Sequence, residues 1–185
     1  MSILIAPVEL STERVLLRPY RIEDAGTVFA AATESVETVG RWMPWCHAGY
    51  TEAESIAWIE KTQSMWQSGE AYEFAVFDPT SNYVGGAGIN QLNRLHNLGN
   101  LGYWVRQSRQ GRGLATAAVR MLAMFGFDAL RLTRIEIVTA SENGASRRVA
   151  EKAGAQFECL ARNRLVINGV ALAAAVHSLV PRVDT

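Results

Sequence analysis

Charge of one sign, cysteine and long apolar runs are all scarce in this sequence, and each scarcity excludes a class of protein. Eighteen Lys and Arg residues balance eighteen Asp and Glu residues, so the basic excess typical of nucleic-acid-binding proteins is missing. The two cysteines, Cys46 and Cys159, are too few for a disulfide framework and suit a reducing compartment. The longest uncharged stretch, residues 165–180, falls short of the ~20 apolar residues that a membrane span requires.

The sequence also lacks the marks of a targeting segment. Residues 1–7 have neither the basic start nor the length of a signal peptide. The 185 residues match the usual range of roughly 100–200 residues for one domain. With 49% hydrophobic and 19% charged residues, the composition is that of a globular chain. We therefore expect a single soluble, cytoplasmic domain over residues 1–185 that binds neither nucleic acid nor a membrane.

Metal-ligand spacing and serine-hydrolase motifs are missing as well. Cys46 and His47 are adjacent, Cys159 lies far away, and no other spacing of ligand residues is typical of a metal site. The Gly-x-Ser-x-Gly motif of the serine hydrolases does not occur. We expect no metal and no covalent serine chemistry.

Strand and helix patterns alternate along the chain. Short β-rich runs predict strands at residues 14–18, 72–77, 83–89, 98–105, 135–138, 157–166 and 170–179. Apolar residues at helical spacing predict helices at residues 22–33, 51–69, 114–130 and 143–153. Residues 41–50 are irregular and rich in aromatic side chains. This order predicts an α/β fold, with a mixed sheet covered by helices on both faces.

The segment with the clearest chemistry joins a predicted strand to a predicted helix. Gly111 and Gly113 lie in the loop before that helix, whose first backbone N–H groups and dipole favour a phosphate. No Lys follows Gly113, which excludes a P-loop. A dinucleotide fingerprint is disfavoured because residues 106–110 separate the glycines from the strand and Glu136 lies inside its strand. An ordinary glycine loop is the remaining alternative.

Two motifs resemble those of the GCN5-related N-acetyltransferases. Gln110-x-x-Gly113-x-Ala115 is similar to their pyrophosphate signature, and residues 143–155 resemble a second motif, in which Asn opens a helix that ends in Glu-Lys-x-Gly. Residues 41–45 and 101–105 further resemble the branch that acetylates ribosomal-protein N-termini. The resemblance implies the GNAT fold, with a central mixed, mostly antiparallel sheet of about seven strands and about four flanking helices.

The resemblance also implies a reaction, in which an acyl group moves from acetyl-CoA, or another acyl-CoA, to a primary amine. The amine attacks the thioester directly in a ternary complex, without a metal. A strand bulge in the region of Tyr103, Trp104 and Val105 would separate two strands for the pantetheine arm, and a backbone N–H there would polarise the thioester carbonyl. The cofactor-binding residues implied are Trp104, Val105, Gln110, Gly111, Arg112, Gly113, Leu114, Ala115, Thr116, Asn143 and Ser146.

A general acid and a general base complete the implied mechanism. Many family members have a Tyr acid at the position of Ala150, so we expect Ser146 to supply the proton here, with a helix-capping role as the alternative. The related branch often has a Glu at the position of Asn100. Glu73 is the candidate base instead, unless it is a solvated carboxylate at a strand end. His47 and His96 are expected on the surface.

The acceptor is assigned to the aromatic segment between the first two helices. Trp42, Pro44 and Trp45 would form its wall, with anchoring of the loop in the core as the alternative for Trp42. The favoured acceptor is a protein N-terminal α-amine, and an amine metabolite or a polyamine is the alternative. A non-catalytic acyl-CoA-binding domain stays open, as does a homodimer.

Overall fold

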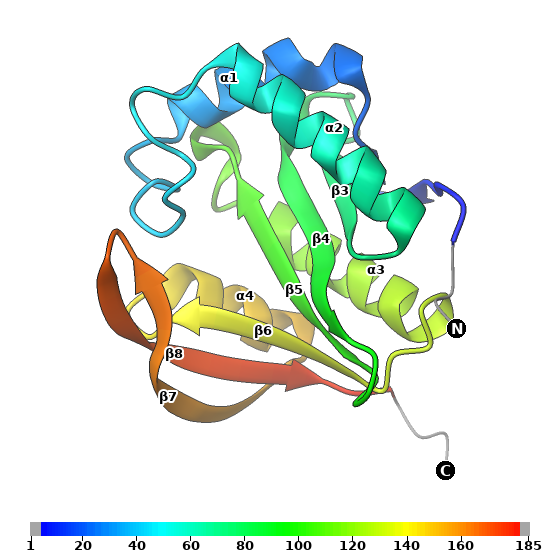
Figure 1. The fold of residues 1–185 in the computed structure, drawn as a ribbon, viewed down its shortest axis with the longest axis vertical. Coiled ribbons are helices and arrows are strands. Elements are labelled where there is room, and N and C mark those ends of the chain that lie inside the picture. Colours follow the sequence, from blue (N-terminus) through cyan, green and yellow to red (C-terminus); the bar gives the residue numbers. More distant parts are fainter. Residues whose placement is uncertain (1–4, 182–185) are drawn as a thin grey trace.

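The protein, described by a computed structural model over residues 5–181, contains one sheet of eight strands in the order β1-β2-β3-β4-β5-β6-β8-β7 (Figure 1). The strands are β1 (Leu10–Ser11), β2 (Leu16–Pro19), β3 (Tyr72–Phe77), β4 (Tyr83–Asn93), β5 (Leu98–Val105), β6 (Arg134–Ala140), β7 (Gln156–Ile167) and β8 (Val170–Leu179). Among the strands within residues 5–181, only β5 and β6 are parallel neighbours. The predicted mixed, mostly antiparallel sheet is confirmed, and the two-residue β1 is the additional strand.

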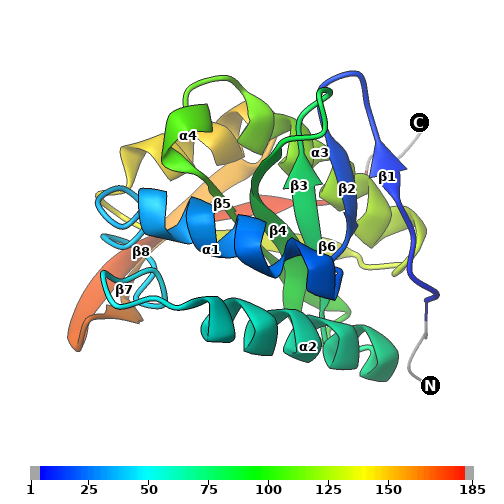
Figure 2. The ribbon, with the colours of Figure 1, turned by 90° about the horizontal axis from the view of Figure 1, so that it is seen from above.

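Helices cover both faces of the sheet, as predicted. Figure 2 shows α1 (Ala25–Glu34) and α2 (Glu52–Ser68) on one side, and α3 (Leu114–Asp128) and α4 (Gly144–Ala153) on the other. Short 3-10 turns, η1 (Ile22–Asp24) and η2 (Gln107–Arg109), precede α1 and α3. None of the helices within residues 5–181 is long and apolar enough to cross a membrane.

Local sequence signals set the ends of α2. The Thr51 side chain accepts a hydrogen bond from the Glu54 N–H, and the Glu54 carboxylate accepts one from the Thr51 N–H at 2.8 Å. This reciprocal capping box is the pattern predicted from the sequence. At the other end Gly69 has a φ of 69°, a left-handed conformation that glycine adopts without a steric penalty.

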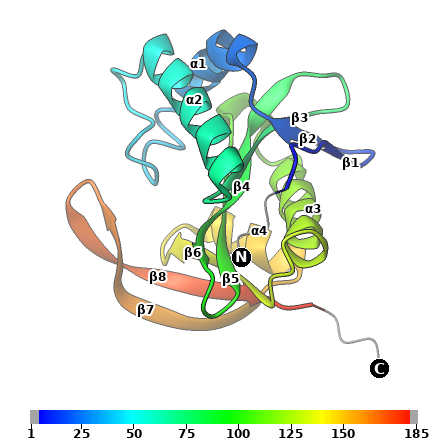
Figure 3. The same ribbon diagram turned by 45° about the vertical axis from the view of Figure 1, so that its right-hand side comes forward.

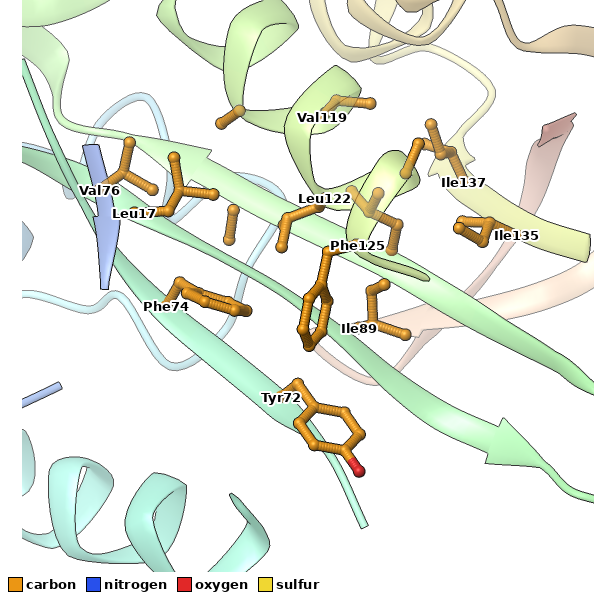
Figure 4. Packing of buried hydrophobic residues seen from close by; sticks show 14 of the residues in the cluster. Leu17, Tyr72, Phe74, Val76, Ile89, Val119, Leu122, Phe125, Ile135 and Ile137 are labelled. Atoms are coloured by element: carbon orange, nitrogen blue, oxygen red, sulfur yellow. The ribbon is translucent and has the colours of Figure 1, made fainter. Parts of the chain in front are cut away.

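The main core lies between the sheet and α3, and Figure 4 shows its packing. Phe125 of α3 packs edge-on against Tyr72 and Phe74 of β3, with ring centroids 5.7 and 5.4 Å apart. Because successive strand side chains point to opposite faces, the intervening Glu73 points toward α1 and α2. The same alternation that builds the core therefore places a carboxylate on the opposite face of the sheet.

The sheet opens between β5 and β6 (Figures 1 and 3). These strands pair only from Leu98 to Asn100, whereas β4 and β5 stay paired as far as Val105. The bulge expected in the region of Tyr103, Trp104 and Val105 is not found, because within residues 5–181 the register between β4 and β5 shifts between Asn90 and Asn93 instead. The strands separate because β6 pairs with β8 along its length and follows that strand. The resulting wedge gives access to the β6-facing edge of β5.

Candidate active site

Two cavities meet at the open end of β5. The first, here called the loop cavity, has a volume of about 560 Å³ and lies between β5, the start of α3 and α4. The second, the carboxylate cavity, has a volume of about 460 Å³ and lies between the β4–β5 pair and α2. Met43, Tyr103 and Trp104 line both cavities, so their contents would meet at these residues.

The loop cavity contains the predicted phosphate loop. Gly113, with a φ of 77°, is the N-cap of α3, and Gly111 has a φ of 74°. Side chains with a Cβ rarely adopt this conformation, so glycine at 113 lets the chain turn into the helix. Helix geometry leaves the N–H groups of the first turn of α3 without intrahelical partners. All seven predicted residues of this segment line the cavity: Gln110, Gly111, Arg112, Gly113, Leu114, Ala115 and Thr116.

The Gln110 side chain holds the loop against β5. Its Nε2 donates to the Val105 carbonyl oxygen at 2.9 Å and to Thr38 Oγ1 at 3.2 Å. The amide that marks the family signature is thus engaged within the protein. Its contribution is to fix the loop, and the backbone N–H groups are left for a ligand.

Cationic side chains surround the loop cavity although the chain has no net charge. Its lining includes one carboxylate, Glu37, and five basic residues, Arg41, Arg109, Arg112, Arg148 and Lys152. This excess suits a polyanion such as coenzyme A, whose phosphates would meet both N–H groups and cations. Sequence reasoning found only Arg112 of the five. The helical spacing of Arg148 and Lys152 was an available signal, because residues four apart share a helix face.

Two predicted site residues, Ser146 and Tyr103, bring their hydroxyl groups together in the wedge between β5 and α4. Tyr103 Oη and Ser146 Oγ are 2.7 Å apart, and the Tyr103 hydroxyl also donates to the Ser146 carbonyl oxygen at 3.0 Å. Burial raises the pKa of Tyr103 to about 12, so this hydroxyl keeps its proton at neutral pH. The N-cap of α4 is Asn143, whose Oδ1 accepts from the Ser146 N–H at 3.1 Å. The Ser146 hydroxyl is therefore not the helix cap.

Glu73 is buried in the carboxylate cavity. Its side chain lies directly over Gly88, where a Cβ would come within 2.0 Å of Glu73 Oε2, and its Oε1 accepts from Asn90 Nδ2 at 2.9 Å. The residue is 9% exposed, so the alternative of a solvated strand-end carboxylate is wrong. Burial raises the pKa of Glu73, because the charged form loses hydration there.

Aromatic residues form one wall of the carboxylate cavity. The Trp45 ring packs edge-on against Trp104 at 5.2 Å and against Tyr50 at 5.9 Å, between ring centroids. The predicted wall residues separate in the structure. Trp45 lines the carboxylate cavity, Trp42 lines the loop cavity, and Pro44 is exposed and lines neither. Sequence reasoning missed Trp58 of α2, which completes this wall.

Cys46 anchors the aromatic segment to α1. The buried Cys46 thiol donates to the Ala32 carbonyl oxygen at 3.4 Å, so this cysteine has a packing role. His47 and His96 are both exposed, as predicted. Among residues 5–181 there is no group of three or more His, Cys, Asp or Glu side chains that could hold a metal ion.

Comparison with known proteins agrees with this geometry. Residues 14–156 match the model of the acetyltransferase (GNAT) domain family. A solved structure from Vibrio cholerae, named as a candidate ribosomal-protein-serine acetyltransferase, is 34% identical, with a TM-score of 0.83 over 94% of this chain and 98% of its own. The N-acetyltransferase YoaA of Bacillus subtilis, itself uncharacterized, is 27% identical over 92% of this chain and 96% of its own.

A solved structure of RimL, a ribosomal L7/L12 α-N-protein acetyltransferase in complex with coenzyme A, shares the fold. Its TM-score is 0.85 at 17% identity, over 95% of this chain and 98% of that one. The fold and the two joined cavities define an N-acyltransferase that uses an acyl-CoA. The chain belongs to the GNAT acetyltransferase family, and its co-substrate is acetyl-CoA, from which an acetyl group passes to a primary amine.

Proposed function

We propose that this enzyme acetylates the N-terminal α-amine of a protein or peptide. The observation that carries the proposal is the junction of the two cavities at Tyr103 and Trp104, which would bring an amine in one cavity to a thioester in the other. An α-amine, with a pKa of about 7.7–8.0, loses its proton more readily than a lysine amine, at about 10.4. The Vibrio cholerae structure and RimL, both named for ribosomal-protein substrates, support the same acceptor class.

Acetyl-CoA would occupy the loop cavity. Its pyrophosphate would accept hydrogen bonds from the N–H groups at the start of α3, and Arg112 and Arg148 would neutralise its charge. The pantetheine arm would lie in the wedge and pair with the free edge of β5 as an added strand does. Asn143 would bind the arm from the other side, with the amide Nδ2 that capping of α4 does not use.

The chemical step then needs two proton transfers. The neutral amine forms a bond to the thioester carbon, and Glu73, directly or through a water, takes the one proton that the nitrogen then loses. A backbone N–H in the Tyr103–Val105 region stabilises the developing oxyanion. When the carbon–sulfur bond breaks, the hydroxyl of Ser146, which contacts the hydroxyl of Tyr103, relays a proton to the thiolate and takes one back from solvent water. The raised pKa of Glu73 makes it a stronger base than an exposed carboxylate.

An acceptor screen tests the proposal. The purified enzyme is mixed with acetyl-CoA and release of free thiol is followed with peptides whose N-termini are free or already acetylated, a polyamine and small amines. We expect turnover with free N-termini and none with the blocked matched peptides. Preference for a polyamine or small amine would support the metabolite alternative. An intact thioester with every amine would support a non-catalytic binding domain.

The cellular setting follows from the same proposal. An enzyme that uses acetyl-CoA and a ribosomal-type acceptor would work in the cytoplasm, and the free thiols of Cys46 and Cys159 fit a reducing compartment. Cell fractionation tests this location. The homodimer stays a prediction, to be tested by sedimentation.

A further inference from the structure

Three polar side chains from the neighbouring strands β3, β4 and β5 form a continuous hydrogen-bonded row. Asn100 of β5 donates through Nδ2 to Asn90 Oδ1 at 3.0 Å, and Asn90 of β4 donates through Nδ2 to Glu73 Oε1 at 2.9 Å. Asn90 and Asn100 are direct cross-strand partners, and Glu73 of β3 pairs with Gly88 of β4. The register of three strands therefore builds this row.

The row has a direction. Each amide donates toward the carboxylate, and an ionised carboxylate can only accept. The Asn90 carbonyl is engaged by Asn100, which fixes the orientation of the Asn90 amide with its NH₂ group toward Glu73. Asn90 lines the carboxylate cavity beside Glu73, whereas Asn100 lies one strand further from it.

We propose that Asn90 and Asn100 are positioning residues, which hold the Glu73 carboxylate in its ionised form and orient it for the incoming amine. This inference rests on the proposed role of Glu73 as the base. Hydrogen bonds to a charged acceptor are stronger than those between neutral groups, and a buried carboxylate without them is costly. Trp66 Nε1 also donates to the Glu73 carbonyl oxygen at 3.0 Å, so the backbone at this position is held as well.

The electrostatic balance at Glu73 supports this role. Burial raises the pKa of Glu73, and the hydrogen bond from Asn90 opposes that rise. The other titratable groups that line the carboxylate cavity are Glu54 and Lys61 of α2, Tyr20 before η1, Tyr50 in the aromatic segment and Tyr103 of β5. The pKa of Glu73 is set by burial and by the Asn90 hydrogen bond, and the Glu73 charge in turn raises the pKa of the neighbouring Tyr20. Loss of the Asn90 amide should therefore act directly on Glu73.

A graded set of variants tests the proposal in the full-length enzyme. Asn90→Ala removes the donor, Asn100→Ala frees the Asn90 amide to rotate, and Asn90→Asp places a second carboxyl group beside Glu73. Asn93→Ala is the matched control, because Asn93 lies at the exposed end of the same strand and bonds only to the His96 N–H among the described contacts. The readouts are the pH dependence of kcat/KM for the acceptor, the affinity for coenzyme A and the melting temperature.

We expect the acidic limb of the pH profile to move upward by about one pH unit in Asn90→Ala, as expected for loss of one charge-assisted hydrogen bond. The shift should be smaller in Asn100→Ala, larger in Asn90→Asp, where two carboxyls share a site, and absent in Asn93→Ala. Activity of Asn90→Ala should recover at high pH, and coenzyme A affinity should stay unchanged. If Asn90→Ala does not fold, the Asn100→Ala variant tests the proposal by itself. An unchanged acidic limb in its pH profile would then contradict the positioning role.

Two negative results separate this inference from the proposed function. If Glu73→Gln is inactive but the acidic limbs of Asn90→Ala and Asn100→Ala match that of the wild type, the positioning role is wrong while Glu73 remains the base. If Glu73→Gln retains full activity, the assignment of the base fails first. A titration of the Glu73 carboxyl carbon by NMR measures the same shift without relying on turnover.

Discussion

The loop cavity and the carboxylate cavity meet at Tyr103 and Trp104 but are built in different ways. The loop cavity is lined by residues 109–116 and by residues within 143–152, which supply backbone N–H groups and basic side chains, and by residues within 37–43 and 103–105. The carboxylate cavity takes its lining from more elements, namely β3, β4, β5, α1, α2 and the aromatic segment. Its chemistry depends on side chains, above all on the buried Glu73.

This difference shows which part of a site a sequence can reveal. A phosphate site made from a helix start needs residues that are close in sequence, so its motif is local. An acceptor cavity collects residues that only the tertiary structure brings together. If the loop cavity binds the donor and the carboxylate cavity binds the acceptor, variants in each cavity should affect only one of the two. The variants below are ordered from the largest expected effect to the smallest.

Glu73→Gln should have the largest effect on catalysis and no effect on coenzyme A binding. Loss of the base should lower kcat by about 10²- to 10⁴-fold, while the amide still fits beside Gly88 and accepts from Asn90. Steady-state kinetics and calorimetry with coenzyme A measure the two quantities. Weaker coenzyme A binding in the variant would contradict the separation of the two cavities.

The same variant should change the pH dependence of stability. Because the pKa of Glu73 is raised in the folded state, its contribution to stability is fully present below the unfolded pKa and is lost as the pH rises through the folded pKa. The stability of Glu73→Gln relative to the wild type should therefore increase as the pH rises from about 4.3, the ordinary pKa of a glutamate, through the raised pKa of the folded state. Thermal unfolding at several pH values measures this gain, and a constant difference would argue against a buried carboxylate.

Ser146→Ala should lower kcat by roughly ten- to a hundredfold with little change in donor affinity, if the hydroxyl protonates the thiolate. Because Tyr103 Oη lies 2.7 Å from Ser146 Oγ, Tyr103→Phe should act on the same step. The double variant should then be less impaired than the product of the two single effects. Independent effects would assign the two hydroxyls to separate steps, and a normal kcat in Ser146→Ala would exclude its role as the acid.

Gly113→Val should weaken coenzyme A binding about tenfold or more, because a β-branched residue at a positive φ strains the start of α3. The nearest atom to a Cβ at this position is 3.8 Å away, so the strain lies in the backbone. Gly169→Val is the matched control, since Gly169 has a φ of 78° in the β7–β8 hairpin, outside the lining of either cavity. Calorimetry should show a loss only in the first variant, and equal affinities would exclude the loop as the pyrophosphate site.

Trp45→Ala should raise the acceptor KM by about three- to tenfold, as expected for loss of an aromatic contact, and should leave coenzyme A affinity intact. Trp42→Ala is the opposite test, because Trp42 lines only the loop cavity. Trp42→Ala should weaken coenzyme A binding and leave the acceptor KM unchanged. A joint fall in coenzyme A affinity and melting temperature in Trp45→Ala would make Trp45 a core residue.

The sequence predicted the fold closely because its signals are local. The capping box at Thr51, the apolar stripe of α3 and the turn at Asn168 and Gly169 each act over a few residues. Boundaries were less accurate where a distant contact extends an element. The strand expected to end at Ile89 continues to Asn93, because β5 provides partners as far as Leu98.

The candidate site also contains parts that local sequence determines and parts that depend on tertiary contacts. The sequence by itself determined the glycine turn before α3 and the Asn143 helix start, because a helix end and a glycine turn carry their own geometry. Only the tertiary structure decided that Glu73 is buried and that Asn90 and Asn100 point their amides toward it. Burial and the pKa depend on what packs around a side chain, and here those neighbours come from strands whose register no short motif encodes.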